Sequence, residues 1–308
     1  MGGTPETLAL EGARVGSATR RRDAVEGWIF VLPLVALLLG FVFYPFFGAI
    51  WLSLNQKVIG APAHWVGIRN YVELLHDPVF LRVLRNTVTY VVGAVSLKLI
   101  FGMLMALVLN QQFRLRNLFR GVYLLPWVVP TAVSALAWTW MFNDVYGIIN
   151  TLLIRAGLID WGLSWLGDYR LAMVAIIAVD VWRGMPFFGV TLLAGLQTVP
   201  TELYEAARID GASPWVQFWR VTLPQIRHVA LITTILSAVW TFGEFQIIYI
   251  LTRGGPGNAT HVFSTYTYEV AFSSANLSKG VAVSLFVLPF LAGAIYLLVR
   301  HMERSELA

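Results

Sequence analysis

Three long stretches of this chain contain no charged residue. Residues 27–56, 121–143 and 280–299 are mostly apolar, and each is long enough to cross a bilayer, which takes about 20 residues in a helix. Backbone groups find no hydrogen-bond partner in lipid, so such segments must satisfy their own backbone as helices. Charged residues make up 13% of the chain, against roughly 25% in a soluble domain. We therefore expect an all-α integral membrane protein.

Three further apolar stretches each contain charge. Residues 89–109 include Lys98, residues 171–193 include Asp180 and Arg183, and residues 229–252 include Glu244. Together with the uncharged stretches they predict six transmembrane helices.

Arginine clusters predict the orientation of these helices. Residues 20–22 are all arginine and precede the first span, and residues 114–120, after the second span, contain three more. Basic residues are retained on the cytoplasmic side of a membrane. We expect residues 1–27 to form a cytoplasmic N-terminal tail, residues 28–308 to form one transmembrane domain, and both termini to be cytoplasmic.

The composition also argues against several functions. A chain of 308 residues with six spans has no room for a nucleotide-binding domain, so any energy source must be a partner. The chain has no cysteine, and its five histidines never repeat at the i, i+4 spacing of a helical metal site. We expect no catalytic residue, no metal and no cofactor. The net charge of +5 is interpreted as basic cytoplasmic loops rather than a nucleic-acid surface.

The connection between the fourth and fifth spans, residues 199–226, contains several helix-boundary signals. Pro200 suits the first position of a helix, and Gly211 can adopt the left-handed conformation that ends one. The Ser213-Pro214 pair is typical of the start of a second helix, and Pro224 is expected to end it. These signals predict a cytoplasmic helix-turn-helix. A connector lying on the membrane surface is the plainer alternative, and a DNA-reading role is disfavoured because spans tether both ends.

The same loop carries a specific sequence pattern. It reads Glu205-Ala206-Ala207, then Gly211, and finally Val221-Thr222-Leu223-Pro224. This pattern resembles the EAA motif of the permease subunits of ATP-binding-cassette (ABC) importers, with Val221 in place of the usual isoleucine. The resemblance implies a coupling helix that docks on an ATPase subunit. The implied coupling residues are Glu205, Ala206, Ala207, Asp210, Gly211, Leu223 and Pro224.

Other stretches resemble the carbohydrate importers of this family, and specifically the MalF-like subunit. They are residues 67–71, 86–87, 193–197 and 251–256. The resemblance implies a type I (MalF/MetI-like) permease bundle in a bacterial inner membrane that works by alternating access. It also implies a MalG-like second permease subunit, two ATPase subunits that bind the ATP and Mg, and an extracytoplasmic solute-binding protein. The glycine-rich residues 254–257 follow a span rather than a strand and are interpreted as a turn.

Two helical stripes are candidates for the substrate path. On each, polar and aromatic residues recur at i, i+3, i+4 and i+7, which places them on one helix face. Charged side chains within a membrane face the protein interior or water, and carboxylates, a guanidinium and aromatic rings suit a sugar, an oligosaccharide or a polyol. The stripes are Asp180, Arg183, Gly184 and Phe187, and Ser237, Trp240, Thr241 and Glu244.

Several alternatives stay open at this point. Asp180 and Arg183, three residues apart, could pair along one helix and have only a structural role. Arg183 could instead receive an acidic or phosphorylated solute such as glycerol phosphate. A function of a different class is an integral-membrane enzyme that uses Asp180 or Glu244 as an acid or base. Lys98 could be structural or could line the path, and Pro186 is a candidate kink in its span.

Overall fold

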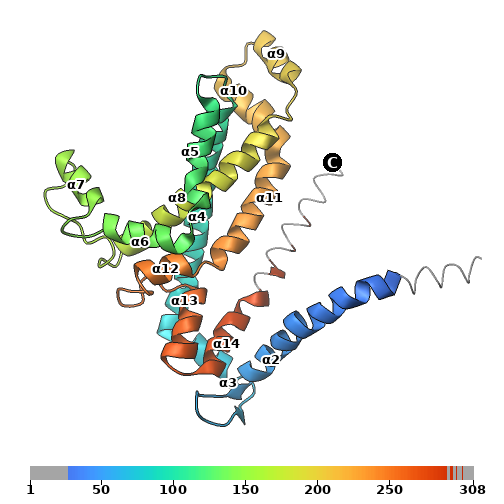
Figure 1. Cartoon of the computed structure of the whole chain (residues 1–308), viewed down its shortest axis with the longest axis vertical. Helices are drawn as coiled ribbons and strands as arrows, with labels where there is room; N and C mark the ends of the chain where they lie inside the picture. The colour runs from blue at the N-terminus through green and yellow to red at the C-terminus, as the bar shows by residue number, and fades with distance from the viewer. Residues whose placement is uncertain (1–26, 290–291, 294–295, 297–299, 301–308) are drawn as a thin grey trace, which may run out of the picture.

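The computed structural model describes residues 27–289 together with residues 292, 293, 296 and 300. In that part of the chain, long helices run side by side through the length of an elongated bundle (Figure 1). The central helices are α4 (Pro78–Asn110), α8 (Leu171–Leu196) and α11 (Leu223–Phe242). The predicted tail, apart from Gly27, and most of the second half of the sixth predicted span lie outside the described residues.

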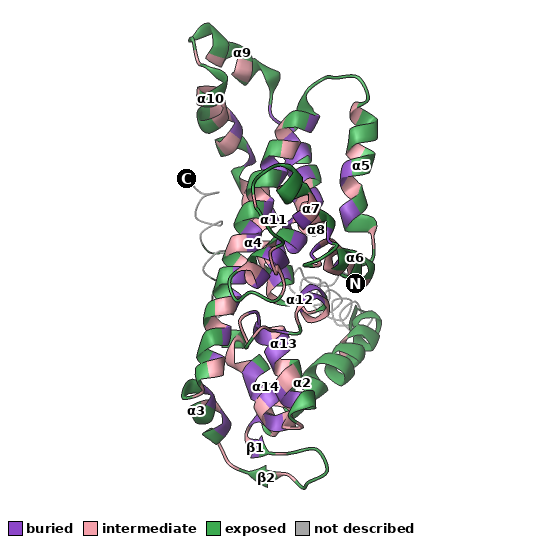
Figure 2. Ribbon diagram, turned by 90° about the vertical axis from the view of Figure 1, so that its left-hand side faces the viewer, coloured by how far each residue is buried: buried purple, intermediate pink, exposed green. Residues whose placement is uncertain are grey.

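Three described helices are long and apolar enough to cross a membrane. They are Gly27–Ser53, Pro78–Asn110 and Leu171–Gln197. The first includes the π-helical turn η1 (Leu39–Phe43) and α2 (Tyr44–Ser53), and it lies at the side of the bundle with its residues largely exposed (Figure 2). The structure therefore confirms a helical fold and contains three candidate membrane spans. Six spans remain a prediction.

A fourth candidate span is sharply bent. Residues 121–143, expected as one helix, are divided between α5 (Arg116–Val128) and α6 (Thr131–Met141), which meet at 93°. Pro130 has no backbone N–H, and a proline also disfavours the helical conformation at the residue before it. Val129 accordingly adopts an extended backbone with ψ of 133°.

The expected span 229–252 is also interrupted. Helix α11 ends at Phe242, and α12 (Gln246–Leu251) begins after a break at residues 243–245. Pro186 lies within α8, which continues through this residue, and the kink expected there stays a prediction. Predicted span ends are therefore less accurate than predicted span centres.

The remaining described elements are short. They are α3 (Arg69–Leu75), α7 (Ile148–Arg155), α9 (Thr201–Ile209), α10 (Pro214–Gln217), η2 (Phe218–Thr222), α13 (Phe263–Tyr268), η3 (Glu269–Ser273) and α14 (Leu277–Phe286), with an antiparallel pair of two-residue strands, β1 (Asn55–Gln56) and β2 (His64–Trp65).

Helices α4 and α8 approach each other closely because small residues lie between them. A Cβ atom on Gly102 of α4 would collide with the Cβ of Phe188 on α8 and lie 3.1 Å from the backbone nitrogen of Gly189. In membranes, where apolar burial does little to drive helix association, such close backbone contact is a main source of packing energy. This contact fixes the register of α4 against α8, and with it the site described below.

Asp77 joins three helices at the end of the bundle opposite α9. Its carboxylate caps α4 by accepting from the backbone N–H of Val79 at 2.9 Å, and it also accepts from the Tyr266 hydroxyl of α13 at 3.0 Å. The ammonium of Lys279, on α14, lies 3.5 Å away. Burial raises the pKa of Asp77, but these hydrogen bonds and the charge of Lys279 outweigh burial and hold that pKa below its ordinary value.

Candidate functional site

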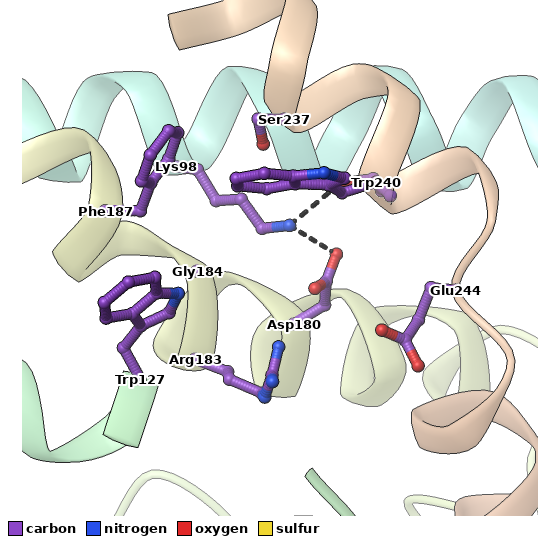
Figure 3. A pocket seen from close by; sticks show the side chains of 10 residues that line it. Lys98, Trp127, Asp180, Arg183, Gly184, Phe187, Ser237, Trp240 and Glu244 are labelled. Atoms are coloured by element: carbon purple, nitrogen blue, oxygen red, sulfur yellow. Dashed lines mark hydrogen bonds and ion pairs between the residues drawn. The ribbon is translucent and has the colours of Figure 1, made fainter. Parts of the chain in front are cut away.

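A small cavity lies where α4, α5, α8 and α11 converge (Figure 3). All eight residues of the two predicted stripes line it. Two more residues complete the lining, one from α4 and one from α5. The full set is Lys98, Trp127, Asp180, Arg183, Gly184, Phe187, Ser237, Trp240, Thr241 and Glu244.

Lys98 connects three helices across this cavity. Its ammonium donates to the Asp180 carboxylate at 2.8 Å and to the Thr241 hydroxyl at 3.0 Å (Figure 3). The side chains of Lys98 and Asp180 are each 5% exposed, so both charges have left water and depend on each other. The alternative in which Asp180 pairs with Arg183 is therefore wrong: the carboxylate pairs with a residue of α4.

Gly184 makes room for the lysine. A Cβ atom at this position would lie 2.5 Å from Cε, 2.9 Å from Cδ and 3.0 Å from Nζ of Lys98. In the structure the Lys98 side chain occupies the space that this glycine leaves.

Aromatic rings form the apolar wall of the cavity. The rings of Phe187 and Trp240 lie 5.0 Å apart between centroids, and Trp127 stacks on Phe187 at 6.5 Å. The cavity thus combines flat apolar faces with a few charged and hydroxyl groups, which is the usual composition of a small-molecule site.

Glu244 and Arg183 also line the cavity but take no part in the ion pair between Lys98 and Asp180. Glu244 is not on the α11 stripe as predicted, because α11 ends at Phe242. Its carboxylate instead accepts from the backbone N–H of Ile247 at 3.0 Å, at the start of α12. The Nε of Arg183 is buried and has no hydrogen-bond partner among the described residues.

The cavity is small in this arrangement. Its volume is about 50 Å³. One water molecule needs roughly 10–15 Å³ of such space, and sites for small molecules usually measure roughly 300–1,000 Å³. The space therefore accommodates a few waters but no sugar ring, and a larger solute requires the helices to move apart.

The second predicted site, residues 199–226, forms the expected helix, turn and helix. Helix α9 ends in a left-handed turn, in which Gly211 has φ of +77° and the N–H of Ala212 donates to the Ala207 carbonyl at 2.8 Å. Ser213 then caps α10 by accepting from the N–H of Val216 at 3.4 Å.

Two details of this loop differ from expectation. Pro200 is the N-cap of α9 rather than its first helical residue. Pro224 does not end the second helix, because residues 214–242 form one uninterrupted helical stretch from α10 through η2 to α11. A π-helical turn precedes Pro224. In it the N–H of Leu223 donates a hydrogen bond to the Phe218 carbonyl, and the chain stays helical past Pro224.

The helices of this loop, α9 and α10, lie at one end of the bundle (Figure 1). Glu205, Asp210 and Gly211 are exposed, and Ile209 is 86% exposed. One contact holds α9 against the following helix, between the hydroxyls of Tyr204 and Thr222 at 3.0 Å. The exposed residues of the EAA pattern are thus free to contact another protein.

Sequence reasoning missed one of the ten cavity residues, Trp127, and left open whether Lys98 lines the path. Lys98 had a usable signal, since a charge within a span marks a polar interior, but its partners lie on other helices. Trp127 gave no signal, because one tryptophan in an uncharged apolar stretch is ordinary.

A polar cavity between apolar helices and an exposed helical loop at one end suit a transport subunit. Residues 98–304 match the model of the family described as binding-protein-dependent transport system inner membrane component. The chain belongs to this family of ABC transporter permeases. Its members are transport subunits, so the enzyme alternative, with Asp180 or Glu244 as acid or base, is wrong.

Individual relatives agree with this assignment over nearly the whole chain. The trehalose/maltose transport system permease protein MalF of Thermococcus litoralis is 39% identical over 292 residues, which cover 94% of this chain and 98% of that one. The lactose transport system permease protein LacF of Rhizobium radiobacter is 34% identical over 285 residues, covering 89% and 95%. A chain of a bacterial alginate ABC transporter, solved in complex with an alginate pentasaccharide-bound periplasmic protein, shares the fold with a TM-score of 0.79 at 22% identity. That alignment covers 92% of this chain and 96% of the solved one.

Proposed function

We propose that this chain is the MalF-like permease subunit of a carbohydrate importer and that solute crosses the membrane through the cavity around Lys98 and Asp180. In this proposal residues 28–308 form a six-span transmembrane domain, residues 1–27 form a cytoplasmic tail, and both termini are cytoplasmic. The cavity opens alternately to the two sides of the membrane.

The observation that carries the proposal is the convergence of both predicted stripes on one cavity. Asp180 and Glu244 can accept hydrogen bonds from hydroxyl groups, Arg183 can donate them, and Phe187 with Trp240 offers flat apolar surface. Relatives whose names specify trehalose, maltose and lactose support a sugar or oligosaccharide as the solute.

The loop at residues 199–226 is proposed as the coupling element. Its exposed residues Glu205 and Gly211, with the helix α9 that carries them, would dock on an ATPase subunit at the cytoplasmic face. Two such ATPase subunits would bind the ATP and Mg, a MalG-like permease would complete the pathway, and an extracytoplasmic binding protein would deliver the solute. The other residues of this coupling site are Ala206, Ala207, Asp210, Leu223 and Pro224.

One observation favours a second candidate solute. The buried Nε of Arg183 lacks a partner among the described residues, and a carboxylate or phosphate on the solute would satisfy it. An acidic sugar or glycerol phosphate therefore belongs in the same uptake assay as the neutral sugars.

Uptake by the assembled complex tests the proposal. The complex is purified with its partner subunits, reconstituted in vesicles with ATP inside, and assayed with labelled trehalose, maltose, lactose, a uronic acid sugar and glycerol phosphate. We expect Trp240→Ala and Glu244→Ala each to abolish uptake while the complex still assembles. The matched control is Trp28→Ala, which removes a 64% exposed tryptophan of the first helix, outside the cavity.

Two results would contradict the proposal. One is wild-type uptake in both cavity variants, which would remove the cavity from the pathway. The other is purification of the chain without any ATPase subunit, which would remove the coupling role of α9.

A further inference from the structure

Lys98 occupies two of the hydrogen-bonding groups that line the proposed sugar path. Asp180 supplies the carboxylate of the first stripe and Thr241 a hydroxyl of the second, and the Lys98 ammonium binds both, at 2.8 and 3.0 Å. With those groups occupied, the cavity of about 50 Å³ is too small for a sugar ring. A sugar can bind both Asp180 and Thr241 only if the lysine gives up these partners.

The position of Lys98 also connects the helices that must move. The lysine lies on α4, Asp180 on α8 and Thr241 on α11, so one ammonium connects three helices. Helix α11 is continuous with α10, and α8 leads into α9 through residues 197–200. The bonds of Lys98 therefore restrain both helices that enter and leave the loop of residues 199–226.

We propose that Lys98 is a positioning residue that holds the empty cavity closed and is displaced by the hydroxyl groups of the arriving carbohydrate. Its ammonium takes the place of solute hydroxyls on Asp180 and Thr241, so that solute binding and release of the three helices are the same event. The inference rests on the proposed function, because it assigns a role within that transport cycle.

A thiol reporter in the cavity tests the closed state without any solute. The chain has no cysteine, so Ser237→Cys, at a lining position that is 4% exposed, is its sole thiol. In the purified complex we expect Lys98→Met to raise the rate at which a small methanethiosulfonate reagent labels this cysteine by about tenfold, because the closed state loses the bonds that favour it. Hydrolysis of ATP without binding protein or sugar should rise in parallel.

A second variant covers the case in which Lys98→Met does not assemble. Lys98→Met alone leaves Asp180 buried without a counter-charge, whereas Lys98→Met combined with Asp180→Leu removes both charges. Both variants lack the bonds of Lys98, so both should label faster and hydrolyse ATP faster without solute. The matched control is Lys279→Met, which removes another Lys–Asp contact between helices, to Asp77, at the far end of the bundle. It should label at the wild-type rate.

The outcomes separate this inference from the proposed function. Wild-type labelling in an assembled Lys98→Met or double variant would overturn the inference, since the pair would then be static. An equal rise in the labelling rate of Lys279→Met would also overturn the inference, because loss of any Lys–Asp contact between helices would then loosen the bundle. If the wild-type complex has no ATPase activity and accumulates none of the solutes in the panel, the proposed function fails, and the labelling rates still decide whether Lys98 closes the cavity.

Discussion

A buried ion pair inside a membrane bundle is tolerated only while both partners are present. A single charge at the centre of a span costs at least about 2.5–3.5 kcal/mol, and removing one partner of a buried pair costs about 3–5 kcal/mol, since the remaining charge is left unpaired. Lys98 and Asp180 meet this condition at 2.8 Å. Their geometry therefore depends strongly on the neighbours that shape the space around the lysine.

Gly184 is the neighbour most sensitive to change. A methyl group at this position would lie 2.5 Å from the Cε of Lys98, so Gly184→Ala must displace the lysine and weaken its contact with Asp180. We expect a loss of about 1–3 kcal/mol, the usual cost of overpacking a filled site. Thermal unfolding of the detergent-solubilised complex, followed by tryptophan fluorescence, measures the change.

Gly121→Ala is the matched control for this measurement. It adds the same methyl group to helix α5, where nothing lies within 4 Å of the added atom, so the unfolding temperature should not fall and should rise slightly with the higher helix propensity of alanine. Equal stability of Gly184→Ala and the wild type would show that the lysine has another position available.

At the level of single residues, periodicity predicted much of the site. Residues at i, i+3, i+4 and i+7 must share a helix face, so each stripe could be assigned from spacing alone, and all eight residues line the same cavity. Spacing could not pair Asp180 with Lys98, because 82 positions separate them and only the packing of α4 on α8 brings them together. It likewise could not show that Glu244 lies beyond the end of α11.

Among the structural elements, the turn between α9 and α10 depends most on a single residue. Gly211 has φ of +77°, and a Cβ atom there would meet nothing within 4 Å. A substitution is therefore disfavoured by backbone conformation alone, at about 1–2 kcal/mol for most residues. We expect Gly211→Val to misplace α9 and to reduce recovery of the ATPase subunits when the permease is affinity-purified.

Gly211→Asn provides the graded comparison. Asparagine adopts the left-handed conformation more readily than other non-glycine residues, so it should retain more of the ATPase than Gly211→Val does. If the two variants recover equal amounts, the conformation of this turn does not control docking.

Sequence signals for elements were reliable where one residue fixes the backbone and unreliable where neighbours decide. Gly211 and the Ser213-Pro214 pair marked the α9–α10 turn correctly. Pro130 offered a similar signal for the 93° bend, but the uncharged run around it favoured a single span. Pro224 predicted a helix end that is absent, because the helix continues past it after a π-helical turn.

At the scale of the whole molecule, the cavity and the exposed loop are linked by rigid elements. Helix α8 carries one stripe of the cavity and reaches α9 through residues 197–200. Residues 214–242 form one helical stretch that begins beside the turn at Gly211 and ends beside Trp240 and Thr241. A force on α10 therefore reaches the second stripe through one continuous helix, and a force on α9 reaches the first stripe through the four-residue connection 197–200, as the proposed coupling requires.

The proposed orientation of this chain in the membrane can be tested with single cysteines. Because the natural chain has none, Val145→Cys and Ile209→Cys each introduce one thiol, at positions that are 90% and 86% exposed. With six spans and cytoplasmic termini, residue 145 faces outward and residue 209 faces the ATPase. In intact cells a membrane-impermeant maleimide should label Val145→Cys at once and Ile209→Cys only after permeabilisation. The reverse pattern would invert the orientation. Labelling of both in intact cells would contradict the assignment of six spans, because two sites on the same side have an even number of crossings between them, whereas this assignment places one crossing, residues 171–193, between these two sites.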